Sequence, residues 1–376
     1  MVYLDYAADT PMREEAIDAF AQTARAFSAN PNSHHPMGEA AAERLAQCSK
    51  NILSLLGVPE HTLIFTSGAT EANNLAIKGA AGNSRSRAKH IVTTWLEHSS
   101  VHGPLAVLQA QGYEVDYAEL GENGKVELES LASLVRPDDT LLVSICYADG
   151  ETGVMQNIDE IGKFLKARFP NTLFHVDATQ AVGKIPVVLE NTDLFTFAAH
   201  KFYGPNGIGA LVMRPGVMVE PQLNGGISTT AFRSGSPALP LSAAMEAALS
   251  LAYGEMETNL ARARTHSTAL KKALSGRRDV IVNSPADALP YIFNFSLVGK
   301  DAPKLITRLG EMGFSLSGKS ACTAPKSVSR PVFALTNDRK RALSTVRVST
   351  GRLTTEEEIA SFLKAFETCM KETEQS

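Results

Sequence analysis

Short apolar runs alternate with longer segments of helical spacing along the first 215 residues of the chain. The apolar runs predict buried strands, at residues 63–65, 90–94, 113–117, 140–147 and 173–177, with a further run that ends at His200-Lys201. Helical spacing predicts helices at residues 14–27, 39–56 and 158–169, and one more that starts near Thr70. Repeated alternation of strand and helix predicts an α/β fold with a mostly parallel sheet and helices on both faces.

The pattern changes after Met213. Residues 225–240 read as a long polar loop, and residues 241–270 predict one long helix that joins two domains. The remaining pattern predicts strands at 291–297 and 344–349, and helices at 302–312 and 354–368. Pro325 and Pro331 predict irregular structure between residues 314 and 341. A length of 376 residues also favours two domains over one core.

Composition excludes several classes of protein. The net charge of -4 gives no reason to expect nucleic acid or an anionic membrane as a partner, and no apolar run approaches the ~20 residues of a membrane span. The N-terminus lacks the features of a signal peptide. The four cysteines form no CxxC pair, so we expect no metal site, no disulfide framework and a reducing cytoplasm. Cys146, inside an apolar run, reads as a core residue.

Two strand ends carry the strongest chemical signal. One buried run ends in Asp177, and the next ends just before Lys201. Ligands of open α/β sheets bind at this edge, so the two side chains are expected to meet one small molecule. An acid and a lysine suit pyridoxal 5'-phosphate (PLP), whose carbonyl forms a Schiff base with lysine and whose ring nitrogen needs an acid. A helix cap at Asp177 and a solvated loop charge at Lys201 are the alternatives.

A second signal indicates a phosphate site. The run at residues 63–65 leads into Ser67-Gly68, and a helix follows from about Thr70-Glu71. Free backbone N–H groups at such a helix start bind phosphate, and the Thr70 hydroxyl adds a donor. Helix capping by Glu71 explains the same residues without a ligand.

Four further residues are candidates because of their setting. His98 follows a strand end, where a histidine can stack on a cofactor and transfer protons, although a lone histidine is more often structural. Arg347 on a strand suits a substrate carboxylate or a structural ion pair. Cys322 lies between two nearby lysines, which favour its thiolate. Ser236, in the polar loop, is a candidate anion ligand.

The chain resembles the cysteine desulfurases of the iron–sulfur-cluster and nitrogen-fixation type, from one end to the other. The resemblance is carried by YLDYAADTP, NPNSHHPMG, TSGATEANNLAIKGA, EHSSV, HVDATQAVGK, HKFYGPNGIGAL, RSGS, SACT and VRVSTGR. It implies the aspartate-aminotransferase-like PLP fold type I. It also implies a large PLP domain at 15–255 and a smaller α+β domain, built from 1–14 and 256–376, that contains the cysteine loop.

The resemblance also implies roles for matching residues. The implied catalytic residues are Cys322, which becomes a persulfide, and Lys201 and His98, which transfer protons. Arg347 binds the substrate carboxylate. Ser236 reaches the phosphate of a neighbouring subunit, which implies a homodimer. The implied cofactor-binding residues are Lys201 as the Schiff-base lysine, Asp177, Gln180, Ala69, Thr70, His98, His200 and Ser236.

The implied reaction converts L-cysteine to L-alanine and passes sulfur to an acceptor protein, for iron–sulfur clusters or tRNA thiolation. Other PLP enzymes of the fold remain alternatives: a selenocysteine lyase, a C–S lyase or an aminotransferase. A non-catalytic member of the fold that binds partner proteins is a further alternative. Two departures from the family pattern bear on this choice. Gly150 replaces an asparagine that touches the cofactor or substrate, and Ala198-Ala199 lacks a serine hydroxyl expected at the phosphate.

Overall fold

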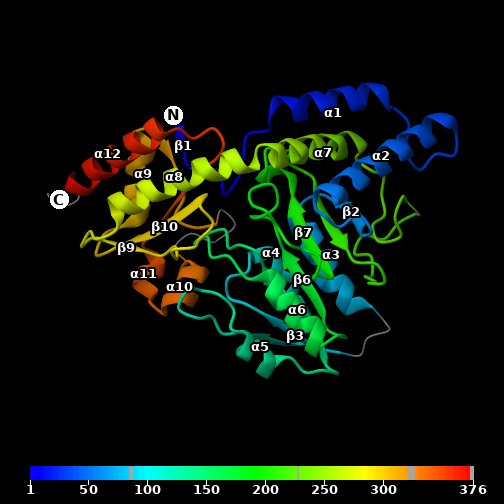
Figure 1. Cartoon of the computed structure of the whole chain (residues 1–376), viewed down its shortest axis with the longest axis horizontal. Helices are drawn as coiled ribbons and strands as arrows, with labels where there is room; N and C mark the ends of the chain where they lie inside the picture. The colour runs from blue at the N-terminus through cyan, green and yellow to red at the C-terminus, as the bar shows by residue number, and fades with distance from the viewer. Residues whose placement is uncertain (84–87, 227, 321–326, 373–376) are drawn as a thin grey trace.

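The larger part of the protein is built on a seven-stranded sheet with the order β2-β8-β7-β6-β5-β3-β4 (Figure 1). The computed structural model describes residues 1–83, 88–226, 228–320 and 327–372. β8 runs antiparallel to β2 and β7, and the other neighbours are parallel, which confirms the predicted mostly parallel sheet. The strands are β2 (Thr62–Thr66), β3 (His90–Thr93), β4 (Glu114–Tyr117), β5 (Thr140–Cys146), β6 (Leu173–Asp177), β7 (Leu194–Ala198) and β8 (Gly209–Met213).

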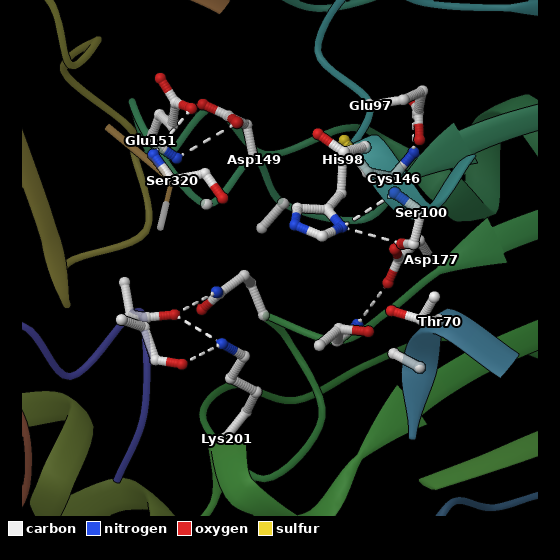
Figure 2. Close-up of a pocket in the computed structure, with 18 of the residues that line it drawn as sticks. Thr70, Glu97, His98, Ser100, Cys146, Asp149, Glu151, Asp177, Lys201 and Ser320 are labelled. Carbon is white, nitrogen blue, oxygen red and sulfur yellow. Dashed lines mark hydrogen bonds between the residues drawn. The ribbon is translucent and has the colours of Figure 1, made fainter. Parts of the chain in front are cut away.

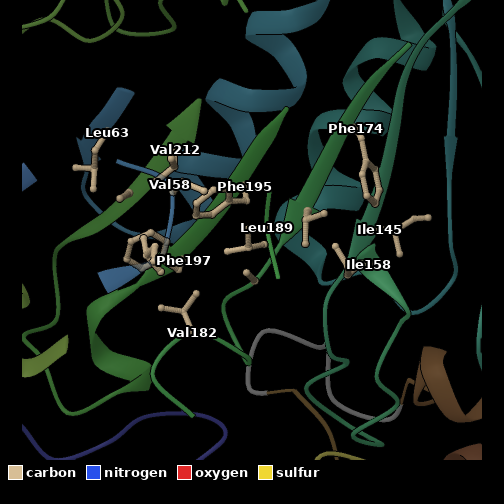
Figure 3. Packing of buried hydrophobic residues seen from close by; sticks show 14 of the residues in the cluster. Val58, Leu63, Ile145, Ile158, Phe174, Val182, Leu189, Phe195, Phe197 and Val212 are labelled. Carbon is tan, nitrogen blue, oxygen red and sulfur yellow. The ribbon is translucent and has the colours of Figure 1, made fainter. Parts of the chain in front are cut away.

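Helices cover both faces of this sheet because strand side chains alternate between them. Leu194 and Leu211 point into a cluster with α3 and α4. Phe195 and Val212, one residue further along each strand, lie in the opposite cluster (Figure 3). The helices of this part are α1 (Glu14–Ala26), α2 (Pro36–Leu55), α3 (Ala69–Gly82), α4 (Ser99–Ala110), α5 (Leu128–Leu134), α6 (Ile158–Arg168) and α7 (Leu239–Gly254).

The two chain ends meet in a second part with its own core, in which both termini lie (Figure 1). Leu4 and the rings of Phe295, Phe362 and Phe366 belong to this core, where Phe366 packs edge-to-face on Phe295 and at a tilt on Phe362. This core is a separate cluster from the one at the large sheet, and the division into 15–255 and 1–14 with 256–376 stays a prediction. The elements are β1 (Val2–Tyr3) paired with β11 (Phe314–Ser315), a sheet of β12 (Thr345–Ser349), β10 (Ile292–Leu297) and β9 (Val280–Val282), and helices α8 (Met256–Leu274), α9 (Ala302–Glu311), α10 (Arg330–Thr336), α11 (Arg339–Leu343) and α12 (Glu356–Glu372).

Two sequence predictions are wrong. The single helix expected at 241–270 is two helices, because α7 ends at Gly254 and α8 begins after Glu255. Glycine is a poor helix former, and Glu255 is drawn into an ion pair with Arg13 at 2.9 Å. The irregular stretch expected around Pro331 contains α10, which has that proline in its first turn, where no intrahelical N–H is needed.

Candidate active site

One cavity of about 710 Å³ lies where strands β3, β5, β6 and β7 end (Figure 2). This is the edge at which open α/β sheets bind ligands. Ser236 does not line the cavity and is exposed. Cys322 lies outside the described residues. The other predicted residues all line it: Ala69, Thr70, His98, Asp177, Gln180, His200, Lys201 and Arg347.

Asp177 is positioned by a buried hydrogen-bond network. Asn73 Nδ2 donates to Asp177 Oδ2 at 2.9 Å, and the Thr179 backbone N–H donates to Oδ1 at 3.0 Å. The Thr196 hydroxyl donates to Asn73 Oδ1, so the amide can present only its NH₂ group to the carboxylate. Asp177 caps no helix. Asn73 is not among the residues predicted from the sequence.

Lys201 follows β7 in a short 3-10 turn, η1 (Ala199–Lys201). Its ammonium donates to the carbonyls of Ala7 and Ala8 at 2.8 and 2.6 Å, so it is not a solvated loop charge. The adjacent His200 also lines the cavity. Burial, together with the Lys201 charge, lowers the pKa of His200 to about 4.

Gln180 is fixed on both sides of its amide. Its Nε2 donates to the Ala7 carbonyl at 2.9 Å, and its Oε1 accepts from Lys184 Nζ at 2.7 Å. Burial, with the nearby Lys201 and Arg347 charges, lowers the pKa of Lys184 well below its ordinary value. Lys184 is a second residue that the sequence analysis missed, because nothing local marks it as buried.

His98 is the N-cap of α4, and its Nδ1 accepts from the Ser100 backbone N–H at 3.1 Å. The Ser100 hydroxyl accepts from Asn73 Nδ2 at 2.9 Å. It also lies 2.8 Å from His98 Nδ1 (Figure 2). Because Nδ1 is an acceptor, the neutral ring carries its proton on Nε2. Burial lowers the pKa of His98, which favours this neutral form.

Glu97, next to His98, is a buried carboxyl in the cavity wall. Its Oε1 accepts from the Thr94 hydroxyl and from the Cys146 backbone N–H, each at 2.9 Å. Its Oε2 has no hydrogen-bond partner among the described residues. Burial raises the pKa of Glu97 to about 8, so the group is mainly protonated at neutral pH. Cys146 is buried, as predicted.

Arg347 lies in the cavity wall and is 2% exposed. Its Nη2 lies 2.6 Å from Asp5 Oδ1, and its Nη1 donates to the Gly150 carbonyl at 2.8 Å. The structural ion pair that the sequence left open is therefore present. Its Nε, although buried, has no partner in the described part of the chain. A substrate carboxylate at this position would share the guanidinium with Asp5.

The start of α3 has the features of an anion site. Within the described residues, the backbone N–H groups of Ala69, Thr70 and Glu71 have no protein acceptor. Gly68 is the N-cap of this helix, and its φ of +152° is one that residues with a side chain rarely adopt. Glu71 is balanced by Arg233, whose Nε lies 3.0 Å from its Oε1. Three N–H groups at the positive end of a 14-residue helix suit a phosphate group.

Comparison with known proteins gives the family. The class-V aminotransferase profile matches residues 2–362. The chain belongs to the class-V aminotransferase family. Proteins named cysteine desulfurase IscS are similar over nearly the whole chain. The one from Neisseria meningitidis serogroup C is 37% identical over 95% of this chain and 89% of its own. The one from an Enterobacter species is 38% identical over 96% of this chain and 91% of its own.

Solved structures agree with this assignment. A NifS-like protein has a TM-score of 0.91 and 31% identity, covering 98% of this chain and 99% of its own. A NifS-like protein from Rickettsia africae has a TM-score of 0.87 and 26% identity, with 99% of each chain covered. These matches confirm the PLP fold type I. The enzymes of this class use PLP, and the amine of Lys201, the buried acid Asp177 and the helix start at α3 fit that cofactor. In the described part of the chain, no helix is long and apolar enough to cross a membrane.

Proposed function

We propose that this protein is a PLP-dependent cysteine desulfurase. It converts L-cysteine to L-alanine and passes the sulfur, as a persulfide on Cys322, to an acceptor protein for iron–sulfur clusters or tRNA thiolation. The observation that carries the proposal is the cavity, which places Lys201, Asp177 and the start of α3 around one space. The full-length similarity to proteins named cysteine desulfurase supports the choice of substrate.

Three groups of the chain would bind the cofactor: the Lys201 amine covalently, the Asp177 carboxylate at the ring nitrogen and the first turn of α3 at the phosphate. When bound, PLP supplies an electron sink for bond breaking at the amino acid. The chain itself supplies the proton transfers. Lys201 is the base and acid at the substrate carbon, and His98 offers the proton on its Nε2.

Arg347 binds the substrate carboxylate through its guanidinium. Asp5, 2.6 Å from Nη2, sets the orientation of that group. Cys322 acts as the nucleophile: its thiolate attacks the substrate sulfur, an S–S bond forms and the C–S bond breaks. The electron pair of the C–S bond goes to the substrate carbon, which takes up a proton and becomes the methyl group of L-alanine. The role of Cys322 rests on the SACT match, since the residue lies outside the described part of the chain.

The working unit in this proposal is a homodimer in the cytoplasm. Ser236 is exposed and has a weak contact of 3.4 Å from Asn30 Nδ2. Its hydroxyl is therefore accessible to the phosphate site of a second subunit, as the resemblance implies. Sedimentation of the holoenzyme tests the dimer.

The experiment that tests the function is alanine formation from L-cysteine with PLP and a reductant. Wild type, Cys322→Ala and Lys201→Ala are compared, with Cys369→Ala as the matched cysteine control because Cys369 is buried in the other core. We expect wild type and the control to form alanine and sulfide, and the other two variants to lose this activity. Full activity in Cys322→Ala would indicate a PLP lyase without a persulfide step. A colourless, inactive wild type would overturn the proposal.

A further inference from the structure

The turn at residues 149–152, at the carboxyl end of β5, joins the sheet to the second part of the protein. Three successive backbone carbonyls of this turn each accept a hydrogen bond from a different segment of that part. The donors are Arg347 Nη1 to the Gly150 carbonyl at 2.8 Å, Asn294 Nδ2 to the Glu151 carbonyl at 3.0 Å and the Ser284 hydroxyl to the Thr152 carbonyl at 2.6 Å. The turn is thus fixed in place from three directions.

The shape of the turn is set by Asp149. Its carboxylate accepts from the backbone N–H groups of Glu151 and Thr152, at 3.2 and 2.6 Å, and from the Thr152 hydroxyl. An aspartate bonded to its own following residues stabilises a tight turn. The side chain of Glu151 is left to point away from the turn, toward Ser320 (Figure 2).

The Glu151 carboxylate binds two residues that are nine positions apart. Its Oε1 accepts from the Ser320 backbone N–H at 2.9 Å, and its Oε2 accepts from the Ser329 hydroxyl at 2.6 Å. Glu151 and Ser329 are buried. Hydrogen bonds to an ionised acceptor are roughly twice as strong as neutral ones. Ser320 and Ser329 directly precede and follow residues 321–328, the segment that contains Cys322.

Each end of this segment is also tied to regular structure. On one side, the Thr345 hydroxyl of β12 donates to the Gly318 carbonyl at 2.7 Å. On the other side, Ser329 is the N-cap of α10. Glu151 therefore links two ends that are already ordered, and fixes both to the cavity wall, which it lines.

We propose that Glu151 is a positioning residue for the sulfur-transfer step, an inference that rests on the proposed function. Its carboxylate fixes Ser320 and Ser329, which flank the segment that contains Cys322, at the cavity, and this favours transfer of sulfur from bound substrate to that thiol. Fixing the ends of a short loop raises the effective concentration of a group within it. In this role Glu151 acts through its bonds to Ser320 and Ser329.

The test is Glu151→Gln in the PLP-loaded enzyme. Glutamine keeps the shape but offers an NH₂ group to one of the two donors. We expect kcat for alanine formation from L-cysteine to fall about 10-fold. The absorbance spectrum of the bound cofactor and the Kd for L-alanine, titrated by that spectrum, should change less than about twofold, since neither depends on Cys322. Ser284→Ala is the matched control, because it removes a bond to the same turn but none to the segment; its kcat should stay within about twofold of wild type.

A second variant and a second readout keep the proposal testable. Ser329→Ala removes one of the two carboxylate bonds and should lower kcat in the same direction, which decides the question if Glu151→Gln does not fold. Hydrogen exchange of peptides containing Ser320 should be faster in Glu151→Gln. This readout needs no turnover, so it remains informative if wild type forms no alanine and the proposed function fails. Wild-type kcat in both variants, or a parallel change of the cofactor spectrum and L-alanine affinity, would overturn the inference.

Discussion

Glu97→Gln tests whether the buried carboxyl in the cavity wall makes stability depend on pH. Glu97 is 2% exposed, and burial raises its pKa from 4.5 to about 8. The native state therefore retains this proton where the unfolded chain has lost it. As pH rises from 4.5 toward 8, the unfolded state is increasingly favoured, so this group stabilises the fold at low pH and that stabilisation is lost as pH rises through 8.

The size of the effect follows from the two pKa values. At 1.36 kcal/mol per pH unit, the change from 4.5 to about 8 corresponds to at most about 5 kcal/mol across the whole range. Between pH 6 and pH 8, this pKa difference lowers the free energy of unfolding by about 2 kcal/mol. Glutamine cannot ionise. Its amide oxygen can still accept from Thr94 and from the Cys146 backbone N–H, so the variant keeps the contacts and loses the pH dependence.

The assay is urea unfolding at pH 6 and pH 8, for wild type, Glu97→Gln and the exposed control Glu60→Gln. The free energy of unfolding of Glu97→Gln, relative to wild type, should rise by about 2 kcal/mol between the two pH values. The free energy of unfolding of Glu60→Gln should match that of wild type at both pH values. A difference between Glu97→Gln and wild type that is the same at pH 6 and pH 8 would refute the reasoning, because Glu97 would then ionise in the native state as it does in the unfolded one.

Two further substitutions separate the cofactor from the substrate. Asn73→Asp replaces the amide that lies 2.9 Å from Asp177 with a second carboxylate, so we expect PLP affinity to fall about 10- to 100-fold in an absorbance titration of the apoprotein; wild-type affinity would contradict the assigned role of Asp177. Arg347→Lys replaces a planar fork that reaches both Asp5 and the Gly150 carbonyl. We expect KM for L-cysteine to rise about 10-fold with a smaller change in kcat, and an unchanged KM would argue against carboxylate binding there.

The sequence was sufficient to predict a mostly parallel sheet and the place of the cavity, but not the antiparallel strand β8. Asp177 is the last residue of β6, and Lys201 follows β7 by three residues, so two strand ends alone indicated that both residues line one cavity. This works because buried parallel strands are continuous apolar runs, and because parallel strands end at a common edge. The helix break at Glu255 was harder to predict, because the ion pair there depends on Arg13, distant along the chain.

The polar partners of Asp177 and Gln180 could not be predicted, for two different reasons. Asn73 is 104 residues from Asp177 and sits on α3, where the sequence reads as an ordinary helix. Lys184 follows a glycine turn, and in the sequence it resembles a surface lysine. Only the structure shows that its ammonium donates to Gln180 Oε1. Hydrophobic pattern indicates which backbone is buried, but not which polar side chains have a partner there.

The cavity is formed by residues from both parts of the protein. Cofactor binding can therefore be tested separately from the steps that involve the substrate and Cys322. Apart from Ser236, which is assigned to a second subunit's phosphate site, the residues assigned to the cofactor lie between Ala69 and Lys201, within the larger part. Arg347 and the residues bound by Glu151 belong to the second part, which closes on the first through the turn at 149–152. Ala7 connects the two parts of the protein, since its carbonyl accepts hydrogen bonds from both Gln180 and Lys201. A substitution at the turn should therefore affect steps that need the second part while cofactor binding persists, and a substitution beside Asp177 should do the reverse.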